Sequence, residues 1–126
     1  MNSRIILLLF LSFIGIFLSS CAAHRTHFMD TLNLKGIKDG TYIGEDTVVI
    51  PPCSVKLATT VKDGKIADIK ILSHIVSYPL AGRAYDILPK RIIERQSLDV
   101  DAVTAATVST NNIKRAVLKA LEKAKQ

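Results

Sequence analysis

The side chains with the clearest chemical potential in this sequence lie in a run of small and hydroxyl-bearing residues at positions 101–110. The run directly precedes a strongly amphipathic segment that predicts a helix. The first turn of a helix has backbone N–H groups without partners and lies at the positive end of the helix dipole, so a phosphate placed there is stabilised by both. Alanines at 105 and 106 leave room for its approach. Four hydroxyls could donate to a phosphate, and one of them could be linked to it: Thr104, Thr107, Ser109 and Thr110.

A structural interpretation of the same run stays open beside this one. Ser, Thr, Asp and Asn are the preferred helix caps, so these ten residues taken alone fit a capping cluster better than a ligand site. The choice between the two depends on the rest of the chain.

The first twenty residues indicate where the protein works. Arg4 is followed by an uncharged apolar run over 5–18, which is shorter than the about 20 residues needed to cross a bilayer. The next segment, Leu18-Ser19-Ser20-Cys21, resembles a bacterial lipobox. The resemblance implies cleavage before Cys21, a diacylglycerol on its sulfur and an acylated amine, which together give stable anchoring. An uncleaved anchor is the alternative. Both place the domain outside the cytoplasm, on a bacterial membrane.

Composition limits the possible partners. Removal of a signal peptide over 1–20 leaves one modest domain, with 16 basic and 11 acidic residues. We expect no nucleic acid partner, because an exported protein seldom meets one and the chain has no Trp to stack on bases. Anionic lipid or an acidic protein fits better, and most of the charges are expected to form a solvated helix face.

Neither the cysteines nor the histidines indicate a metal or a disulfide. A lipidated Cys21 leaves Cys53 alone, so no disulfide is expected, and Cys53 fits a small buried apolar group. His24 and His27 follow Cys21 without a third ligand. No metal site is therefore predicted.

The elements that must position the run are predicted from periodicity. A tether over 21–38 leads into a domain over 39–126. Alternation with period two predicts strands over 41–50, 55–62 and 67–71. Pro51-Pro52 ends the first strand in a turn or at a sheet edge.

The turn between the second and third strands sets the register. A two-residue loop would place Leu57 opposite Lys70 and scramble the apolar face. A three-residue loop over 62–64, with Gly64 left-handed, places Leu57 opposite Ile69. We therefore predict a bulged hairpin with the longer loop.

Two helical regions follow. One over 80–97 is expected to be divided at Pro89, and its side chains that pack on the sheet are Tyr85, Leu88, Ile92 and Ile93. The last helix has an apolar stripe at helical spacing: Ile113, Ala116, Val117, Ala120, Leu121 and Ala124. The fold class expected is α+β, a small antiparallel sheet with a bulged hairpin, covered by the C-terminal helices.

Three segments follow one another along the chain: DGTYIG at 39–44, VKDGKI at 61–66 and VDAVTAATVSTNNI at 100–113. Together they resemble the FMN-binding domain of the peripheral flavin subunits in the sodium-pumping NADH:quinone oxidoreductase and its Rnf relatives. The family pattern in the last segment is an aspartate, two residues, Ser/Thr-Gly-Ala-Thr, one variable residue and two hydroxyl residues. Three motifs in order are stronger support than any one alone. The domain over 39–126 is then expected to be the FMN-binding domain.

The resemblance implies a covalent cofactor. In that family a flavin transferase uses FAD and magnesium to attach FMN through a phosphoester to the threonine that closes the motif, which is Thr107 here. A threonine hydroxyl is a poor nucleophile without a base and a metal, which the transferase supplies, so Thr107 must be reachable. The FMN-binding residues implied around it are Asp101, Thr104, Ala105, Ala106, Val108, Ser109 and Thr110. Asp101 is expected to position the loop or guide the transferase, since two anions repel.

One position departs from the pattern, because the glycine of the family is Ala105 here. If the backbone is left-handed at this point, alanine costs roughly 1–2 kcal/mol. If glycine provides only clearance, a methyl group is tolerated. The family also tends to place a histidine after the third strand. His74 matches it, and His74 or the nearby Tyr78 could line the isoalloxazine ring, with packing as the alternative role.

The function expected is an exported lipoprotein that carries FMN as an electron relay. The flavin supplies the chemistry. Because no catalytic acid, base or substrate pocket is visible, an electron carrier or a subunit of a redox complex fits better than an independent enzyme. Two alternatives are a flavin-free structural or sensory module of the same fold, favoured by Ala105, and a basic lipoprotein that binds envelope polymer or anionic lipid.

Overall fold

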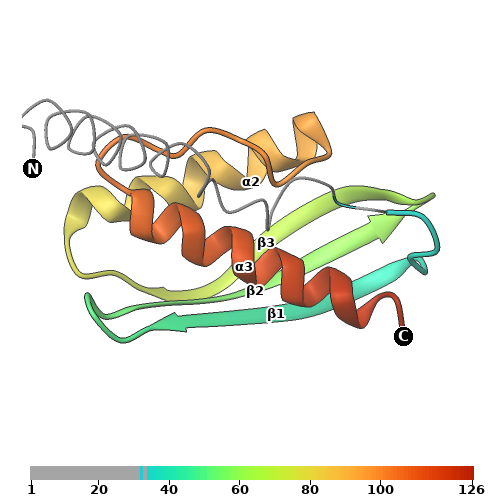
Figure 1. Cartoon of the computed structure of the whole chain (residues 1–126), viewed down its shortest axis with the longest axis horizontal. Helices are drawn as coiled ribbons and strands as arrows, with labels where there is room; N and C mark the ends of the chain where they lie inside the picture. The colour runs from blue at the N-terminus through green and yellow to red at the C-terminus, as the bar shows by residue number, and fades with distance from the viewer. Residues whose placement is uncertain (1–31, 33) are drawn as a thin grey trace, which may run out of the picture.

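The computed structural model describes residues 32 and 34–126. The predicted signal peptide over 1–20, the lipidation site Cys21 and most of the predicted tether over 21–38 lie outside the described residues. In chain order the described part contains strands β1 (Gly40–Val48), β2 (Cys53–Lys62) and β3 (Lys65–Ile75), the 3-10 helix η2 (Pro79–Gly82), and the helices α2 (Arg83–Arg95) and α3 (Thr107–Lys123) (Figure 1).

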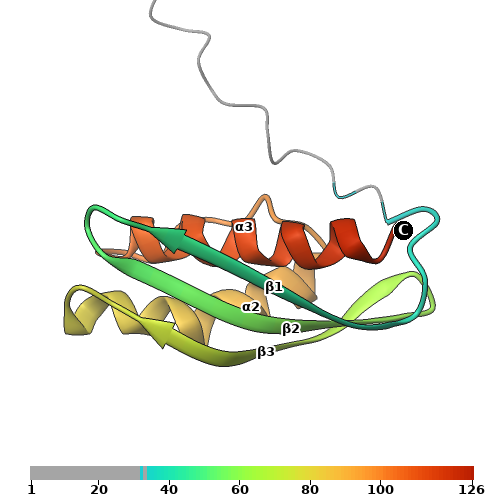
Figure 2. The same ribbon diagram turned by 90° about the horizontal axis from the view of Figure 1, so that it is seen from below.

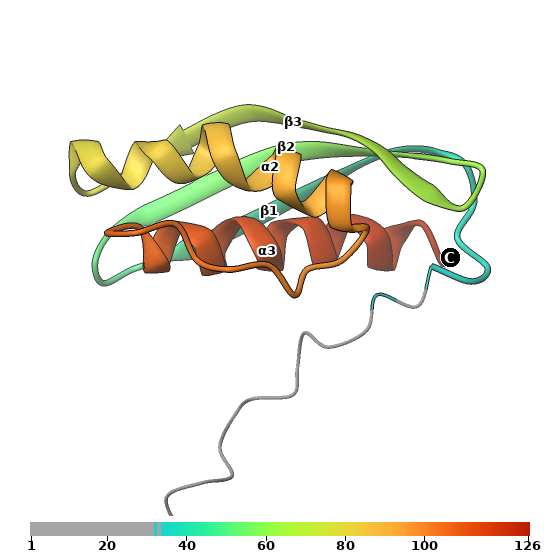
Figure 3. The same cartoon turned by 90° about the horizontal axis from the view of Figure 1, so that it is seen from above.

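The architecture has two layers. The three strands form an antiparallel sheet in the order β1-β2-β3, and α2 and α3 lie on the same face of it (Figures 2 and 3). α3 packs on β1 and β2, whereas α2 packs on β3. The predicted α+β class, with C-terminal helices covering a small antiparallel sheet, is confirmed.

The core lies between the sheet and the two helices, and both predicted apolar stripes face it. On α3 and its end the whole predicted stripe is buried: Ile113, Ala116, Val117, Ala120, Leu121 and Ala124. On α2 the predicted packing residues are buried or partly buried: Tyr85, Leu88, Ile92 and Ile93. Burial of these side chains is the main force that holds the layers together.

The small residues of α3 bring this helix very close to the first strand. Gly44 on β1 lies under Ala116, and a Cβ atom built on Gly44 would lie 1.8 Å from the carbonyl oxygen of Ala116. Only a residue without a side chain fits at this crossing. The last glycine of the DGTYIG segment therefore has a packing role.

The hairpin between β2 and β3 differs from the prediction. Its loop has two residues, Asp63 and Gly64, both with positive φ (52° and 70°), and Lys62 pairs with Lys65. The predicted three-residue loop is wrong. Two consecutive residues with positive φ match the right-handed twist of the flanking strands, and Asp-Gly favours this turn.

The apolar face is restored by a bulge within β3 instead. Val61 pairs with Ile66 and Thr60 with Asp68, so Ala67 is an extra residue, and Leu57 then lies opposite Ile71. The predicted pair of Leu57 with Ile69 is therefore also wrong. A bulge inside a strand shifts the register by one residue, as a longer loop would.

A side chain from α2 stabilises the strand beside this bulge. The amide of Gln96, at the end of α2, accepts a hydrogen bond from the N–H of Ile66 and donates one to its carbonyl oxygen, each at 2.8 Å. These bonds pair backbone groups on the outer edge of β3, which is an edge strand of the sheet formed by the described residues. The local hairpin pattern contains no sign of this distant contact.

The predicted division at Pro89 is also wrong. α2 is continuous from Arg83 to Arg95 with Pro89 inside it, and the irregular part is η2, which comes before it. Proline has no N–H for the helical ladder. Pro89 itself is buried with Tyr85 and Leu88 on the sheet-facing side of α2, so tertiary packing offsets the lost hydrogen bond.

The chain enters the fold beside the end of α3. Ile37 is buried in the core, and the N–H of Lys38 donates to the carbonyl of Ala124 at 3.2 Å. Figure 3 shows this entry at the C-terminal end of α3, away from its first turn. Within residues 32 and 34–126, no helix has the length and apolarity that a bilayer crossing requires.

We predict that Gly44→Ala destabilises the protein, because the new methyl group meets the backbone of Ala116 and forces α3 away from β1. Overpacking of this kind costs about 1–3 kcal/mol or more. Urea unfolding monitored by circular dichroism measures it. Gly82→Ala is the matched control, since Gly82 has ordinary helical φ and no atom within 4 Å of the added Cβ. Equal stabilities of the two variants would contradict the close approach.

Candidate functional site

The predicted acceptor residue lies at the surface, at the first position of α3. Thr107 begins this helix and its side chain is exposed. Ala105, two residues earlier, has φ of +61°, and the N–H of Ala106 donates to the carbonyl of Val103 at 2.9 Å to close a turn. Positive φ at the third residue of such a turn is where glycine is usual. Of the two possibilities open for Ala105, the left-handed backbone is therefore correct.

The first turn of α3 has no side-chain cap. The N-cap residue is Ala106, no side chain bonds to the N-terminal N–H groups as a cap, and the first turn has no acidic residue. The interpretation of 101–110 as a capping cluster is therefore wrong. Backbone N–H groups at this end, with the positive end of the helix dipole, suit an anion.

Burial separates the four hydroxyls of the run. Thr104 and Thr107 are exposed, whereas Ser109 and Thr110 are buried. The Thr110 hydroxyl accepts a hydrogen bond from the N–H of Val103 at 3.1 Å, which ties the loop to α3. Among the other predicted positions, Asp101, Ala105 and His74 are exposed, Val108 is half-buried and Ala106 is buried. Of the four hydroxyl residues, Thr104 and Thr107 are therefore the ones open to solvent.

Two aromatic side chains near the end of β3 contact this region. The Tyr78 hydroxyl donates to the carbonyl oxygen of Ala105 at 2.9 Å. The exposed His74 stacks on the buried Tyr85, with ring centroids 4.3 Å apart and an interplanar angle of 20°. Both residues thus have structural contacts. His74 stacks on Tyr85 with one face of its ring and remains exposed to solvent.

A buried polar cluster lies beneath the start of α3. The Cys53 sulfur lies 3.4 Å from the Tyr85 hydroxyl and 3.8 Å from the Ser109 hydroxyl, and its thiol donates to Oδ1 of Asn112 at 3.5 Å. Burial raises the pKa of Tyr85, as does the adjoining Cys53. The prediction that Cys53 is buried is confirmed, but it contacts polar groups, which the sequence did not indicate.

Asp46 continues this cluster to the first strand. The Asn112 amide and the Arg115 guanidinium each donate to its Oδ2 at 2.8 Å, and the Lys119 ammonium to its Oδ1 at 2.6 Å. Burial raises the pKa of Asp46, but the bonds from Lys119, Arg115 and Asn112 lower it more, so the pKa lies below its ordinary value. One signal was available in the sequence: Asp46 shares the inward face of β1 with Gly44.

The basic side of α3 is used within the protein. The sequence predicts a solvated face, but four of its cations contact the chain itself. Besides Arg115 and Lys119, Lys123 donates to the carbonyl of Ile43 at 2.7 Å and Lys114 to that of Val100 at 2.6 Å. Burial lowers the pKa of Lys114, although nearby acidic side chains oppose this. These bonds fasten α3 along β1 and to the loop before Thr107.

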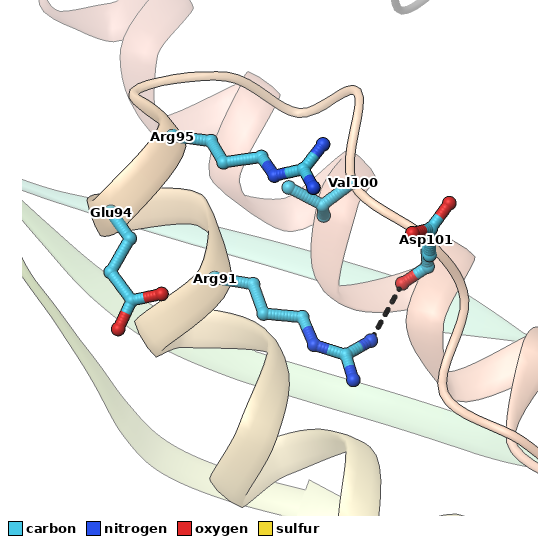
Figure 4. Close-up of a pocket in the computed structure, with 5 residues that line it drawn as sticks. All are labelled: Arg91, Glu94, Arg95, Val100 and Asp101. Atoms are coloured by element: carbon cyan, nitrogen blue, oxygen red, sulfur yellow. Dashed lines mark hydrogen bonds between the residues drawn. The ribbon is translucent and has the colours of Figure 1, made fainter.

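A surface pocket of about 310 Å³ lies between α2 and the start of that loop (Figure 4). It is lined by Arg91, Glu94, Arg95, Val100 and Asp101. Arg91 donates to the carbonyl oxygen of Asp101 at 3.2 Å. This bond positions the backbone of Asp101 and leaves its side chain at the surface.

The chain matches the family model of the FMN-binding domain over residues 54–122, which is more than half of its length. The chain belongs to the FMN-binding domain family. FMN is its cofactor, and the match includes Thr107 and the whole of the loop before α3. The described residues contain no group of three His, Cys, Asp or Glu side chains placed to hold a metal ion.

A solved structure is also similar. The crystal structure of the CPE2226 protein from Clostridium perfringens superimposes with a TM-score of 0.56 at 28% identity. The match covers 71% of this chain and 89% of that chain. The arrangement described here is therefore shared by another protein of nearly the same domain length.

We predict that Asp46→Asn lowers stability by about 1–3 kcal/mol near neutral pH, because Arg115 and Lys119 lose their buried anion. The folded-state pKa of Asp46 is depressed, so its contribution is present above the ordinary pKa and is lost as pH falls through the folded-state value. Urea unfolding near pH 7 and near pH 3 should show a smaller difference at the lower pH.

Glu45→Gln is the control for this experiment. Glu45 is the neighbouring residue on β1, and its ion pair with Lys56, at 3.1 Å, is exposed. An exposed pair contributes about 0–1 kcal/mol. An Asp46→Asn effect no larger than that of Glu45→Gln would show that the buried carboxylate does not hold α3.

Proposed function

We propose that this chain is an extracytoplasmic, lipid-anchored electron carrier that holds FMN through a phosphoester on Thr107. The observation that carries the proposal is an exposed threonine hydroxyl at the first position of a helix whose N-terminus has no side-chain cap. It occurs in a chain of the FMN-binding domain family, at the threonine that the motif resemblance implies as the acceptor.

The phosphate end of FMN fits this position. A phosphodiester keeps one negative charge, which the N–H groups of the first turn and the helix dipole stabilise. The first turn holds no acidic residue that would repel it. The buried hydroxyls of Ser109 and Thr110 have contacts within the fold, which supports Thr107 rather than its neighbours as the acceptor.

The flavin ring fits the apolar surface at the same end of the molecule. The β1–β2 hairpin, the end of β3, η2 and the first turn of α3 lie together at this end (Figure 1). Their exposed apolar side chains are Val49, Ile50, Ile75 and Leu80, with exposed fractions of 78%, 87%, 64% and 54%. Exposed apolar side chains that gather at one end of a molecule are candidates for contact with an apolar ligand. His74 on β3 is a further candidate for contact with the ring.

FMN supplies electron transfer when bound, and the protein orients it. The proposed partners are a flavin transferase that uses FAD and magnesium, redox proteins not yet identified, and the membrane through the lipid on Cys21.

The alternative of a flavin-free structural or sensory module is based on Ala105. Its support is weak, because the left-handed turn forms with alanine at this position. The polymer binder is also weakened, because four cations of α3 bond to the protein itself.

The linkage is tested by co-expressing the domain with a flavin transferase and measuring its mass after denaturation. We expect an FMN adduct in the wild type and none in Thr107→Ala, because the acceptor oxygen is gone. Thr104→Ala, which removes the other exposed hydroxyl of the loop, should keep the adduct, and Thr107→Ser should keep it in part. An adduct on Thr107→Ala, or no adduct on the wild type, would overturn the covalent assignment.

The anchor is tested with the full chain expressed in a bacterium. Cys21→Ser should move the protein from the membrane fraction to the soluble extracytoplasmic fraction, because the thioether-linked diacylglycerol cannot form. Fractionation followed by immunoblotting measures it. Retention of Cys21→Ser in the membrane after a carbonate wash would instead support the uncleaved anchor.

A further inference from the structure

We propose that Tyr78 is a positioning residue for flavin attachment: its hydroxyl holds the left-handed turn at Ala105 and thereby presents Thr107 to the transferase. This inference rests on the proposed function. It concerns a contact between the end of β3 and the acceptor loop, and it explains how an alanine is tolerated at this position.

The turn needs a contact of this kind. Ala105 has φ of +61°, a region that costs an alanine free energy because its Cβ approaches the following carbonyl oxygen. Ala105 is also exposed, so no burial of its methyl group offsets that cost. The left-handed state is therefore expected to exchange with other conformations unless another group favours it.

The contacts at the turn come from two directions. The Val103 carbonyl accepts from the N–H of Ala106 at 2.9 Å, and the Val103 N–H donates to the Thr110 hydroxyl at 3.1 Å. The first bond lies within the loop, and the second joins the loop to α3. Tyr78 binds the carbonyl of Ala105 from a different part of the fold at 2.9 Å. Rotation of Ala105 out of the left-handed region would move that carbonyl, so the bond reports directly on the strained residue.

Tyr78 is itself well anchored. Its carbonyl accepts from the N–H of Ala81, a buried residue of η2, at 3.1 Å. The hydroxyl of the preceding Ser77 donates to the carbonyl of Pro52 at 2.5 Å. A side chain that starts from a backbone held on both sides loses little entropy on binding, so its hydrogen bond can offset a cost of the same order.

The fraction of molecules with the turn formed determines how well the transferase binds this acceptor. A transferase that needs Thr107 in the presented geometry binds only the fraction of molecules with the turn formed, and its apparent affinity falls with that fraction. Loss of the Tyr78 hydroxyl should therefore raise the KM for this acceptor and leave kcat unchanged. Global unfolding would also lower the competent fraction, so the rescue by Ala105→Gly separates the role of the turn from a general loss of stability.

The experiment measures flavin attachment by purified transferase, with FAD and magnesium, to four forms of the mature protein: wild type, Tyr78→Phe, Ala105→Gly and the double variant. We expect Tyr78→Phe to raise KM about three- to tenfold, which corresponds to the loss of one hydrogen bond. With glycine at 105 the left-handed state is not strained, so the same change should have almost no effect. Such a cycle isolates the coupling between the two sites.

Tyr42→Phe is the matched control, because the Tyr42 hydroxyl also donates to a backbone carbonyl, that of Lys38, at 3.1 Å. It lies at the other end of the sheet from the hairpin that adjoins Thr107. Its loss should leave KM unchanged. If the KM of Tyr78→Phe equals that of wild type, or if Ala105→Gly fails to rescue it, the proposal is overturned.

A second measurement separates this proposal from the covalent assignment. Hydrogen exchange of the Ala106 N–H reports the turn in the protein without flavin, since this group bonds to Val103. Exchange should be faster in Tyr78→Phe than in the wild type. In the double variant it should equal the exchange of Ala105→Gly. Absence of any adduct on the wild type overturns the linkage at Thr107, whereas unchanged exchange in Tyr78→Phe overturns the role of Tyr78.

Discussion

The contact between α3 and β1 is the constraint on which the rest of this structure depends. Gly44 allows the backbone of Ala116 to approach the strand, and the buried carboxylate of Asp46 binds Arg115 and Lys119 from the same helix. The first contact sets how close the helix lies, and the second sets its position along the strand. Because the helix is rigid, these contacts along its length also place its first turn. The buried carboxylate of Asp46 therefore helps to fix the position of Thr107, although the two residues are not in contact.

The start of α3 combines a fixed backbone with an open surface. The polar cluster around Cys53 and Asn112 lies beneath it, and the loop before it is tied by Thr110, Arg91 and Lys114. No side chain caps its N-terminal N–H groups. Natural helices usually end with such groups paired to a cap or to water. A helix start that is held from below and exposed above supports the proposed phosphate site.

The two errors in the predicted fold have the same origin. The two-residue turn was rejected because it would scramble the apolar face, but a bulge at Ala67 corrects the register inside β3. The division of α2 at Pro89 was expected from the missing N–H, but the buried side of α2 keeps the helix continuous. In both cases the burial of apolar side chains is kept by an irregularity of the backbone: a bulge in β3, and a proline inside α2. Hydrophobic burial decides such cases because it is worth more than one backbone hydrogen bond.

By itself the sequence determined the strands, the buried stripe of the last helix and the place of Thr107 directly before that stripe. These follow from periodicity and from motifs that are contiguous in the chain. Only the tertiary structure decided the conformation of Ala105, its contact with Tyr78 and the bonds around Asp46. Tyr78 and Ala105 are 27 positions apart, and Asp46 and Arg115 are 69 apart. Pairs so distant leave no periodic signal, because their meeting depends on how the layers pack and not on the residues beside them.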